Sequence, residues 1–498
     1  MRLLVVFAIL GSALAPAGAA ARSSAGPAAP AELPVVVIEG LELRDLEALV
    51  GRAAVGLLVP GAGPETSESL ARAAVEHGEA RNSLHGGLPE GPRRIRVRRA
   101  AVVPETPAIV LGLPRGGRQP NDRRYPIAVV APGYRGLLTS PSTRIAGLVS
   151  AVDVAPTALR EAGRLATAPA DDPVAELRDL DARIRDNGKA RQPASIVAAV
   201  LVALLAFLGG RGALVGVAAA LLANLVLGAA EISEPWLTVP IVAGSVLAGA
   251  LGRRLSDKTL GLLLAATVAT YLVAMGLDDR WVALSPLGPS QNARFYGLSN
   301  LLETMLLVPA LASAALLGRR GGSLPFATVA AVALVAVAGS RFGADGGGAI
   351  VFAAGFAVLA ALLVGGGRRA VALAAAGAAA VVLLLALDAA LGPATHVGET
   401  VRGGPSELAE DLGDRVSLSW RRATARAQDV LVVTGGIALL ALLGARLRRL
   451  PREHAALPLA FVAAIAVSLL VNDSPVDVTL WGLAGLLAAQ AALRPQRL

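Results

Sequence analysis

Cysteine is absent from the chain and histidine is scarce. Without cysteine, the sequence has no disulfide framework, no thiolate metal site and no thiol nucleophile. Only four histidines occur, and their scarcity limits metal chemistry that depends on imidazole ligands. They are His77, His85, His396 and His454. The sequence therefore predicts no metal site and indicates no particular cofactor.

Lysine and aromatic residues are also rare. Lys189 and Lys258 are the only lysines among 46 basic residues, and aromatic residues make up 3% of the chain. The bias towards alanine, arginine and glycine is typical of a GC-rich bacterial genome. Apolar sequence is abundant, since 54% of the residues are hydrophobic and the mean hydropathy is +0.61. Long apolar runs from Ile196 onward therefore predict a polytopic membrane protein rather than a large soluble core.

The formal net charge of +9 fits this interpretation. In a soluble protein such an excess would suggest nucleic acid as a partner. Here many arginines flank the apolar runs, where basic residues set the orientation of membrane helices. We therefore expect a lipid bilayer as the partner and no nucleic acid, while protein partners stay open.

The first 21 residues are typical of a secretory signal peptide. Arg2 precedes an apolar run from Leu3 to Leu14, and small residues follow it. Cleavage is expected near Ala19 or Ala21. The alternative is an uncleaved anchor, and both interpretations export the residues that follow.

Residues 32–170 are expected to form an exported α/β domain. Four short apolar runs predict strands, at 34–38, 53–59, 108–111 and 127–130. Helical segments are predicted at 45–50, at 67–77 and within 153–163. Apolar strands that alternate with helices indicate an α/β layer built on a largely parallel sheet.

The stretch from Pro126 to Leu159 resembles the C-terminal part of the alkaline phosphatase superfamily, which includes sulfatases and phosphoglycerate mutases. The matching features are Pro132-Gly133 after a strand, Ser142-Thr143-Arg144, Gly147-Leu148-Val149 and Asp153-Val154-Ala155-Pro156-Thr157. The run from Val35 to Leu41 is similar to the opening strand of that family. The resemblance implies a shortened version of this fold.

The resemblance does not carry the family's metal chemistry to this chain. Glu39 stands where the opening strand of the family delivers a metal-binding aspartate, and the family's Asp-His-Gly element is missing. Thr66 matches the place of a nucleophile, but an N-cap for the helix that begins near Ser67 is the favoured interpretation. His77 and His85 are expected at the surface. We therefore expect an inactive relative, a pseudoenzyme.

Residues 171–191 are rich in charge and are expected to form an amphipathic connector. Leu177, Leu180 and Ile184 recur at helical spacing, and a solvated stalk is the favoured interpretation. Residues 192–498 then form the polytopic transmembrane domain, an all-α unit of about eleven helices. The predicted spans centre on 196–208, 213–230, 237–251, 260–275, 298–317, 326–337, 350–364, 371–387, 430–443, 457–471 and 478–492.

Charge between the spans predicts the orientation in the membrane. If the first domain is exported, every loop on the other side is net basic, as the positive-inside rule requires. These loops include Arg253 and Arg254, Arg319 and Arg320, and the run from Arg446 to Arg452. The predicted location is the bacterial cell membrane, with the N-terminal domain outside and the C-terminus in the cytoplasm.

The outer loops carry the candidate site residues. Asn300, Glu303 and Thr304 lie at i, i+3 and i+4, so they share one helix face. A carboxylate inside a membrane helix is energetically costly unless it faces protein, water or a partner. Glu303, Asp345 in its glycine-rich turn and His396 are the candidate catalytic residues. The candidate substrate-binding residues are Asp278, Asp279, Arg294, Tyr296, Asn300, Arg341, Asn472 and Asp473. The alternative for any one of them is a polar loop residue or a helix cap.

A second resemblance involves the string from Ala293 to Asn300 together with Asn472-Asp473-Ser474. It is similar to elements of uncharacterised bacterial multi-spanning proteins that carry a comparable exported domain, and it implies no known activity.

Three functions remain open from the sequence. The outer cavity is predicted to handle a lipid-linked or anionic substrate of the cell envelope, by analogy with polytopic enzymes that use lipid-linked sugars. In a transporter, Glu303 would instead titrate or bind a cation along a path. In a non-catalytic scaffold, the exported domain would bind a partner. An active phosphatase or sulfatase is the least supported, because its ligands are missing.

Overall fold

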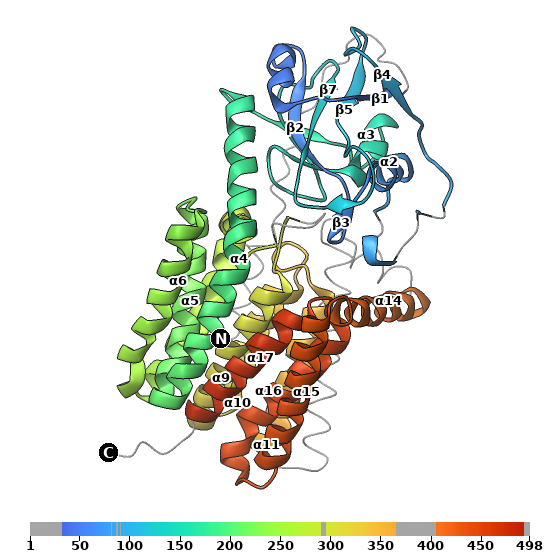
Figure 1. Ribbon diagram of the computed structural model, residues 1–498. Coiled ribbons are helices and arrows are strands. Elements are labelled where there is room, and N and C mark those ends of the chain that lie inside the picture. Colours follow the sequence, from blue (N-terminus) through green and yellow to red (C-terminus); the bar gives the residue numbers. More distant parts are fainter. Residues whose placement is uncertain are drawn as a thin grey trace.

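The computed structural model describes residues 32–80, 82–85, 88–89, 91–289, 295–364 and 405–492 of the 498. It has two parts, a mixed α/β sheet region and a helix bundle (Figure 1). The signal-peptide residues, the predicted span 371–387, Arg294 and His396 lie outside the described residues.

An eight-stranded sheet organises the first part. The strands are β1 (Val35–Ile38), β2 (Ala54–Val59), β4 (Val97–Ala100), β5 (Ala108–Leu111), β7 (Tyr125–Val130), β8 (Gly136–Thr139), β9 (Leu148–Ser150) and β10 (Ala166–Ala168). Their order is β10-β8-β2-β7-β5-β1-β4, with β9 also paired to β2. The short strands β3 (Glu65–Thr66) and β6 (Gln119–Pro120) pair separately.

The sheet is mixed, so the prediction of a largely parallel sheet is only partly confirmed: of the seven pairings among its described strands, four are parallel and three antiparallel. β1 runs parallel to β4 and β5, but β7 runs antiparallel to both β2 and β5. A parallel neighbour requires a long crossover, usually a helix. The segment between β5 and β7 contains only the two-residue strand β6, so the chain turns back beside β5.

Each face of the sheet buries a separate apolar core, because the strands are rich in Val, Ile and Leu. One face packs against α2 (Glu68–His77) and α3 (Val154–Ala158). The other packs against the 3₁₀ helix η1 (Leu43–Leu49), the start of α4 (Pro173–Gly209) and the loop residues Leu284 and Phe295. This second core joins the sheet region to the helix bundle. The remaining short helices are η2 (Ser83–His85) and η3 (Ala151–Asp153).

The connector is not a solvated stalk, which corrects the favoured prediction. Helix α4 (Pro173–Gly209) is continuous from the sheet region into the bundle (Figure 1). Leu177 and Ile184 are buried in the second core, and Arg124 of the β6–β7 loop pairs with Asp181 at 2.7 Å. The amphipathic pattern therefore reflects packing on the sheet region rather than exposure on all sides.

Apolar helices form the second part. They are α5 (Arg211–Ala229), α6 (Pro235–Ala248), α7 (Asp257–Leu277), α9 (Asn300–Gly321), α10 (Ser323–Ala338), α11 (Gly346–Val364), α15 (Ala427–Leu447), α16 (Arg452–Val471) and α17 (Pro475–Ala492). The short helices η4 (Gly249–Arg254) and α8 (Arg280–Ala283) follow α6 and α7. In the part of the chain that the structure describes, eight helices, α4 among them, are long and apolar enough to cross a bilayer. The chain is therefore a multi-pass membrane protein, and the ten predicted spans that can be compared each fall on a helix.

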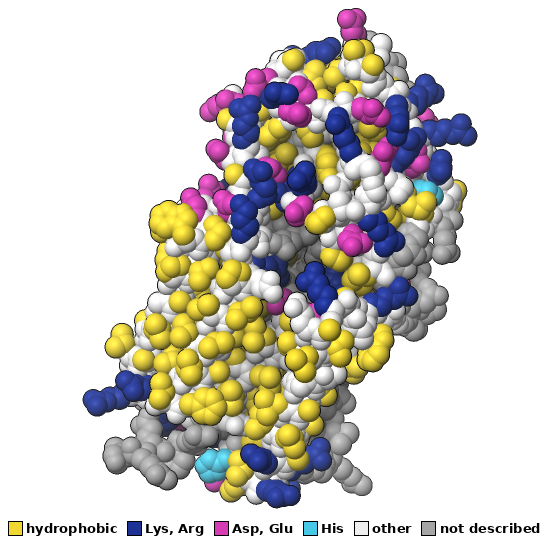
Figure 2. All heavy atoms as spheres, in the orientation of Figure 1, with side chains coloured by type: hydrophobic (Ala, Val, Ile, Leu, Met, Phe, Trp, Pro, Cys, Tyr) yellow, Lys and Arg dark blue, Asp and Glu magenta, His cyan; other side chains and the backbone are white. Residues whose placement is uncertain are grey.

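Helix α9 lies at the centre of the bundle, since 89% of the residues in its most apolar stretch are buried inside the protein. Helix α14 (Pro405–Ala423) lies across the end of the bundle beneath the sheet region (Figure 1). Its residues Val416 and Trp420 are exposed, as expected for an amphipathic helix at a membrane surface. Basic side chains gather at the opposite end of the bundle (Figure 2).

Candidate functional site

Polar side chains from four segments meet at the end of the bundle that faces the sheet region. The segments are the first turn of α9, the residue that precedes α11, the α16–α17 loop and helix α14. We call this set the mouth cluster. It consists of Asn300, Glu303, Asp345, Arg415, Arg422, Asn472 and Asp473.

Glu303 is the innermost carboxylate of the mouth cluster. Helix α9 starts at an N-cap, Ser299, whose Oγ accepts a hydrogen bond from Leu302 N at 3.2 Å. The side chain of Glu303 follows one turn later and is fully buried. Asn472 Nδ2 donates to both of its carboxylate oxygens, at 3.3 and 3.2 Å, and also to Ser468 Oγ at 2.9 Å. The amide therefore fixes the position of the carboxylate.

Two glycines of α11 make room for these groups. A Cβ on Gly348 would lie 2.8 Å from Glu303 Cδ and 2.6 Å from Val337 Cγ1. A Cβ on Gly347 would lie 2.9 Å from Asn472 Oδ1 and 3.3 Å from Arg415 Nη1. Both distances to Gly348 are shorter than ordinary van der Waals contact. The helix backbone thus approaches the cluster closely because it carries no side chains there.

Asp345 stands at the start of α11. Its Oδ1 accepts a hydrogen bond from Gly348 N at 3.2 Å, and its backbone carbonyl accepts one from Ala349 N. The carboxylate therefore caps the helix and lies 3.4 Å from the position of a Cβ on Gly347. The structure places Asp345, a predicted catalytic residue, at the mouth cluster and gives it a capping role.

The outer half of the cluster is built around Asp473. Asn300 Nδ2 donates to Asp473 Oδ1 at 2.6 Å and to Ser474 Oγ at 3.3 Å. Arg422 Nη1 lies 3.1 Å from Asp473 Oδ2 and 2.8 Å from the carbonyl oxygen of the same residue. Asn300, Glu303, Asn472 and Asp473, all predicted site residues, are therefore brought together.

The candidate site residues chosen from the sequence did not include the arginines of this site. Arg415 and Arg422 are seven residues apart, which is two helical turns, so both lie on one face of α14. That spacing was the signal that could have found them. Arg191 of α4 was also missed. It donates to the carbonyl oxygen of Gly288 at 2.7 Å and interacts electrostatically with Asp473.

Among the other predicted site residues, Tyr296 contacts the sheet region. Arg144, in the turn between β8 and β9, places its guanidinium 3.9 Å from the ring centroid of Tyr296. Arg144 Nη1 also donates to the carbonyl oxygen of Ser340 at 2.8 Å, next to Arg341. Asp278 is engaged by Arg280 at 2.7 Å. Arg144 therefore joins the sheet region to the bundle, and this interface was not foreseen.

The turn that presents Arg144 is itself fixed. Arg144 has a φ of 59°, a left-handed conformation that is uncommon for residues other than glycine. Asp153 accepts hydrogen bonds from Ser142 N at 3.0 Å, from Ser142 Oγ at 2.8 Å and from Ser140 Oγ. Burial raises the pKa of Asp153, and these hydrogen bonds oppose the rise. This network therefore holds the strained turn in place.

Asp279 should make the stability of the protein depend on pH. Burial raises its pKa to about 6, and the charge of Arg144 opposes the rise. Because this pKa lies above that of an unfolded aspartate, at about 4, the folded protein holds the proton more tightly. The contribution of Asp279 to the free energy of unfolding is complete below about pH 4 and is lost as the pH rises through about 6.

We therefore expect the melting temperature of the wild type to fall, relative to Asp279→Asn, between about pH 4 and pH 7. Thermal unfolding in detergent micelles over that range measures the difference. Two curves that stay parallel would contradict the prediction.

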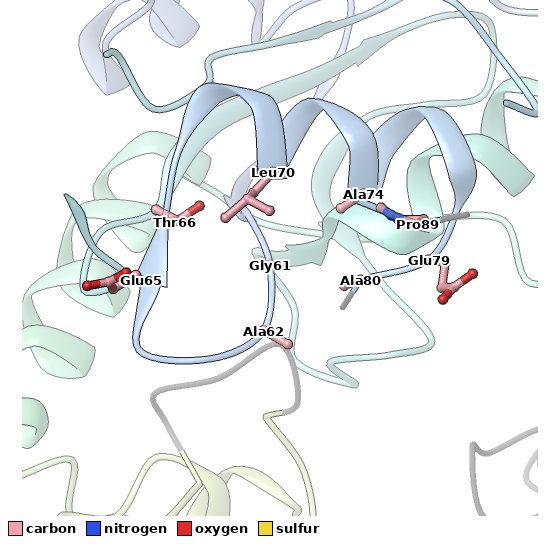
Figure 3. Close-up of a pocket in the computed structure, with 9 residues that line it drawn as sticks. All are labelled: Gly61, Ala62, Glu65, Thr66, Leu70, Ala74, Glu79, Ala80 and Pro89. Carbon is pink, nitrogen blue, oxygen red and sulfur yellow. The ribbon is translucent and has the colours of Figure 1, made fainter. Parts of the chain in front are cut away.

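The sheet region offers little room for a substrate at Thr66. Ser67, not Thr66, is the N-cap of α2, and its Oγ accepts from Leu70 N at 3.3 Å, so the predicted capping role of Thr66 was wrong. Thr66 Oγ1 is buried and has no hydrogen-bond partner among the described residues. It lines a cavity of about 10 Å³, large enough for one water molecule (Figure 3). Glu39 pairs instead with Arg99, at 3.2 Å.

Metal ligands do not gather in the part of the chain that the structure describes. No group of three or more His, Asp or Glu side chains there is arranged to hold a metal ion. Comparison with known proteins gave no match to the chain among family models, curated proteins or solved structures.

Proposed function

We propose that this membrane protein binds a lipid-linked, phosphate-bearing substrate of the cell envelope at its mouth cluster, with Glu303 as the acid–base group. In this proposal the mouth faces the outside of the bacterial cell. The sheet region is a shortened, inactive relative of the alkaline phosphatase superfamily that covers the site. Arg415 and Arg422 supply the positive charge that an anionic substrate requires.

The burial of Glu303 is the observation that carries the proposal. A carboxylate inside a membrane helix is expensive and is a functional candidate by default. Here it is fully buried, bonded to Asn472 and approached by a glycine backbone. A group in such surroundings is a good proton donor or acceptor, because its proton affinity responds strongly to a charged neighbour.

The distribution of charge supports the proposed orientation. Basic residues lie at the ends of helices away from the sheet region, at Arg253 and Arg254 in η4, Arg319 and Arg320 in α9, and Arg446 in α15. Cytoplasmic loops are enriched in such residues. The mouth and the sheet region then lie on the outer side.

Glu303→Gln tests this proposal. The substitution keeps the size of the side chain and one acceptor oxygen for Asn472 Nδ2, but it removes the charge and the capacity for proton transfer. In a strain that lacks the chromosomal gene, we expect the variant to restore the wild-type profile of lipid-linked phosphates at least about tenfold less efficiently, since general acid–base groups typically contribute 10²–10⁴-fold. Mass spectrometry of extracted lipids measures the profile.

Glu234→Gln is the matched control. Glu234 precedes α6 and is exposed, and its side chain accepts a hydrogen bond from Ser233 N at 3.3 Å. It should complement like the wild type. Full complementation by Glu303→Gln, at equal protein levels, would remove Glu303 from the mechanism and with it the proposal.

Coupled transport is the second candidate, and it is favoured by the same observation. A buried carboxylate one turn inside α9 could carry a proton or bind a cation along a path. Proteoliposomes distinguish the two functions. Substrate flux that depends on a proton or cation gradient, and that disappears in Glu303→Gln, would favour transport over chemistry at a fixed site.

A further inference from the structure

A large cavity lies between the sheet region and α4, away from the mouth cluster. Its volume is about 680 Å³, enough for a polar headgroup. It is lined by the end of β2, the β6–β7 loop, one face of α4 and Phe295. The face of the molecule drawn in Figure 2 is hollowed at the junction of the two parts, and basic side chains gather around the hollow.

The polar lining of this cavity carries excess positive charge. Arg123, Arg124, Arg185 and Lys189 face two acidic residues, Asp122 and Asp181. Asp181 already pairs with two of them, since it lies 2.7 Å from Arg124 Nε and 3.3 Å from Arg185 Nε.

Two cations of the lining remain accessible. Lys189 forms an exposed i,i+3 pair with Asp186, which contributes little because water screens it. Arg123 is exposed and forms no ion pair with any residue in the described ranges. Arg123 and Lys189 are therefore the side chains that can turn to an anion.

The floor of the cavity is apolar. Val59, Ile184 and Phe295 line it and are almost completely buried. Charged groups on an apolar floor suit a ligand that has both a phosphate and a flat, less polar part, such as a sugar ring. A purely ionic ligand would leave this floor unused.

The height of the cavity along α4 matches a headgroup attached to a membrane lipid. The apolar part of α4 begins near Ile196, and Lys189 precedes it by seven residues. At 1.5 Å of rise per residue, Lys189 lies about 10 Å above the hydrocarbon. The polar layer of a bilayer extends about 5–8 Å beyond its hydrocarbon core on each side. A group that projects slightly from the headgroup layer would therefore reach the cavity.

We propose that this cavity is a binding site for the phosphate-bearing headgroup of a membrane-linked ligand, held by Arg123 and Lys189. The inference rests on the proposed function, because it gives the headgroup of the same class of substrate a second binding place, apart from the mouth cluster. A soluble phosphate has the same recognition chemistry and is separated from the lipid by the experiment.

The experiment uses the full-length protein and two probes. Inorganic pyrophosphate is titrated by calorimetry into protein held in phosphatidylcholine nanodiscs. Retention of phosphatidate from mixed micelles is measured by native mass spectrometry. The double variant Arg123→Gln/Lys189→Gln should bind at least one probe about tenfold more weakly than the wild type, because it loses two charge-assisted contacts. Loss for pyrophosphate alone identifies a soluble ligand, and loss for phosphatidate identifies a lipid.

Arg96→Gln/Arg98→Gln is the matched control. Both of its arginines are exposed at the edge strand β4, far along the sheet from the cavity. It removes the same charge and should bind both probes like the wild type. If both double variants bound the probes equally more weakly than the wild type, net charge alone would explain the effect and the site would be rejected. Absence of binding by the wild type would also reject the site. The melting temperatures of both variants should remain unchanged, since all four side chains are exposed.

Glu303→Gln separates this inference from the proposed function. Glu303 belongs to the mouth cluster and does not line the cavity, so this variant should bind the probes normally while it fails in the deletion strain. Normal probe binding with full complementation would leave the cavity in place and reject the role of Glu303. If Glu303→Gln failed to complement and the wild type did not bind the probes, the role of Glu303 would stand and the cavity site would be rejected.

Discussion

Replacing Gly348 with alanine is expected to destabilise the helix bundle by about 1–3 kcal/mol, the usual cost of an added methyl group in a packed interior. The new Cβ would lie 2.6 Å from Val337 Cγ1, 2.8 Å from Glu303 Cδ and 2.9 Å from Glu303 Oε2. Glu303 is fully buried and bonded to Asn472, so its side chain can yield only by leaving that hydrogen bond. The variant should therefore also lose function, as is expected of Glu303→Gln.

Gly244→Ala is the matched control for this substitution. Gly244 lies inside α6, and no heavy atom comes within 4 Å of a Cβ built on it. Alanine there should stabilise the helix by about 0.5–1 kcal/mol, because glycine is a poor helix former. Thermal unfolding in detergent micelles gives both values. Equal stability of the two variants would mean that the close approach of α11 to Glu303 is not a constraint.

The helix bundle could be predicted largely from the sequence. Apolar runs of bilayer length need no knowledge of their neighbours, since the membrane imposes their length and composition. This is why the runs that start near Ile196 and Leu298 fall on α4 and α9. Helix ends were less certain, because caps such as Ser299 shift them by a few residues.

The sheet region could be predicted only in part. Buried strands give apolar runs whether their neighbours are parallel or antiparallel, so the run in β7 carried no information on its direction. The connector posed a similar problem. Leu177 and Ile184 define an apolar stripe, but the sequence does not say what covers that stripe. Tertiary packing decided both cases.

The candidate site, too, could be predicted only where local spacing in the sequence determines it. The local spacing of Asn300 and Glu303 correctly placed both at the start of α9, on the side of the mouth. Their partners Asn472 and Asp473 lie far along the chain, and only the packing of α16 and α17 beside α9 brings them close. The interface made by Arg144 depends in addition on how the sheet region docks, which no local pattern encodes.

Asn224→Leu is expected to destabilise the bundle by about 2–4 kcal/mol, because it leaves buried polar groups without partners. Asn224 lies in the apolar helix α5 and is fully buried. Its Oδ1 accepts from Leu287 N at 2.9 Å, and its Nδ2 donates to Ser285 Oγ at 2.9 Å. Leucine has a similar volume but can do neither, so Leu287 N would lose its partner.

The effect should extend beyond the bundle, since the loop to which Asn224 is hydrogen-bonded also accepts hydrogen bonds from α4. Asn187 Nδ2 donates to the carbonyl oxygen of Leu284 at 2.7 Å, and Arg191 donates to that of Gly288. Loosening this loop should expose the α4 contacts to hydrogen exchange as well as lower the melting temperature. The control Ser245→Ala removes an exposed hydrogen bond within α6 and should change stability by less than about 0.5 kcal/mol. If Asn224→Leu behaved like this control, the buried amide would not anchor the loop.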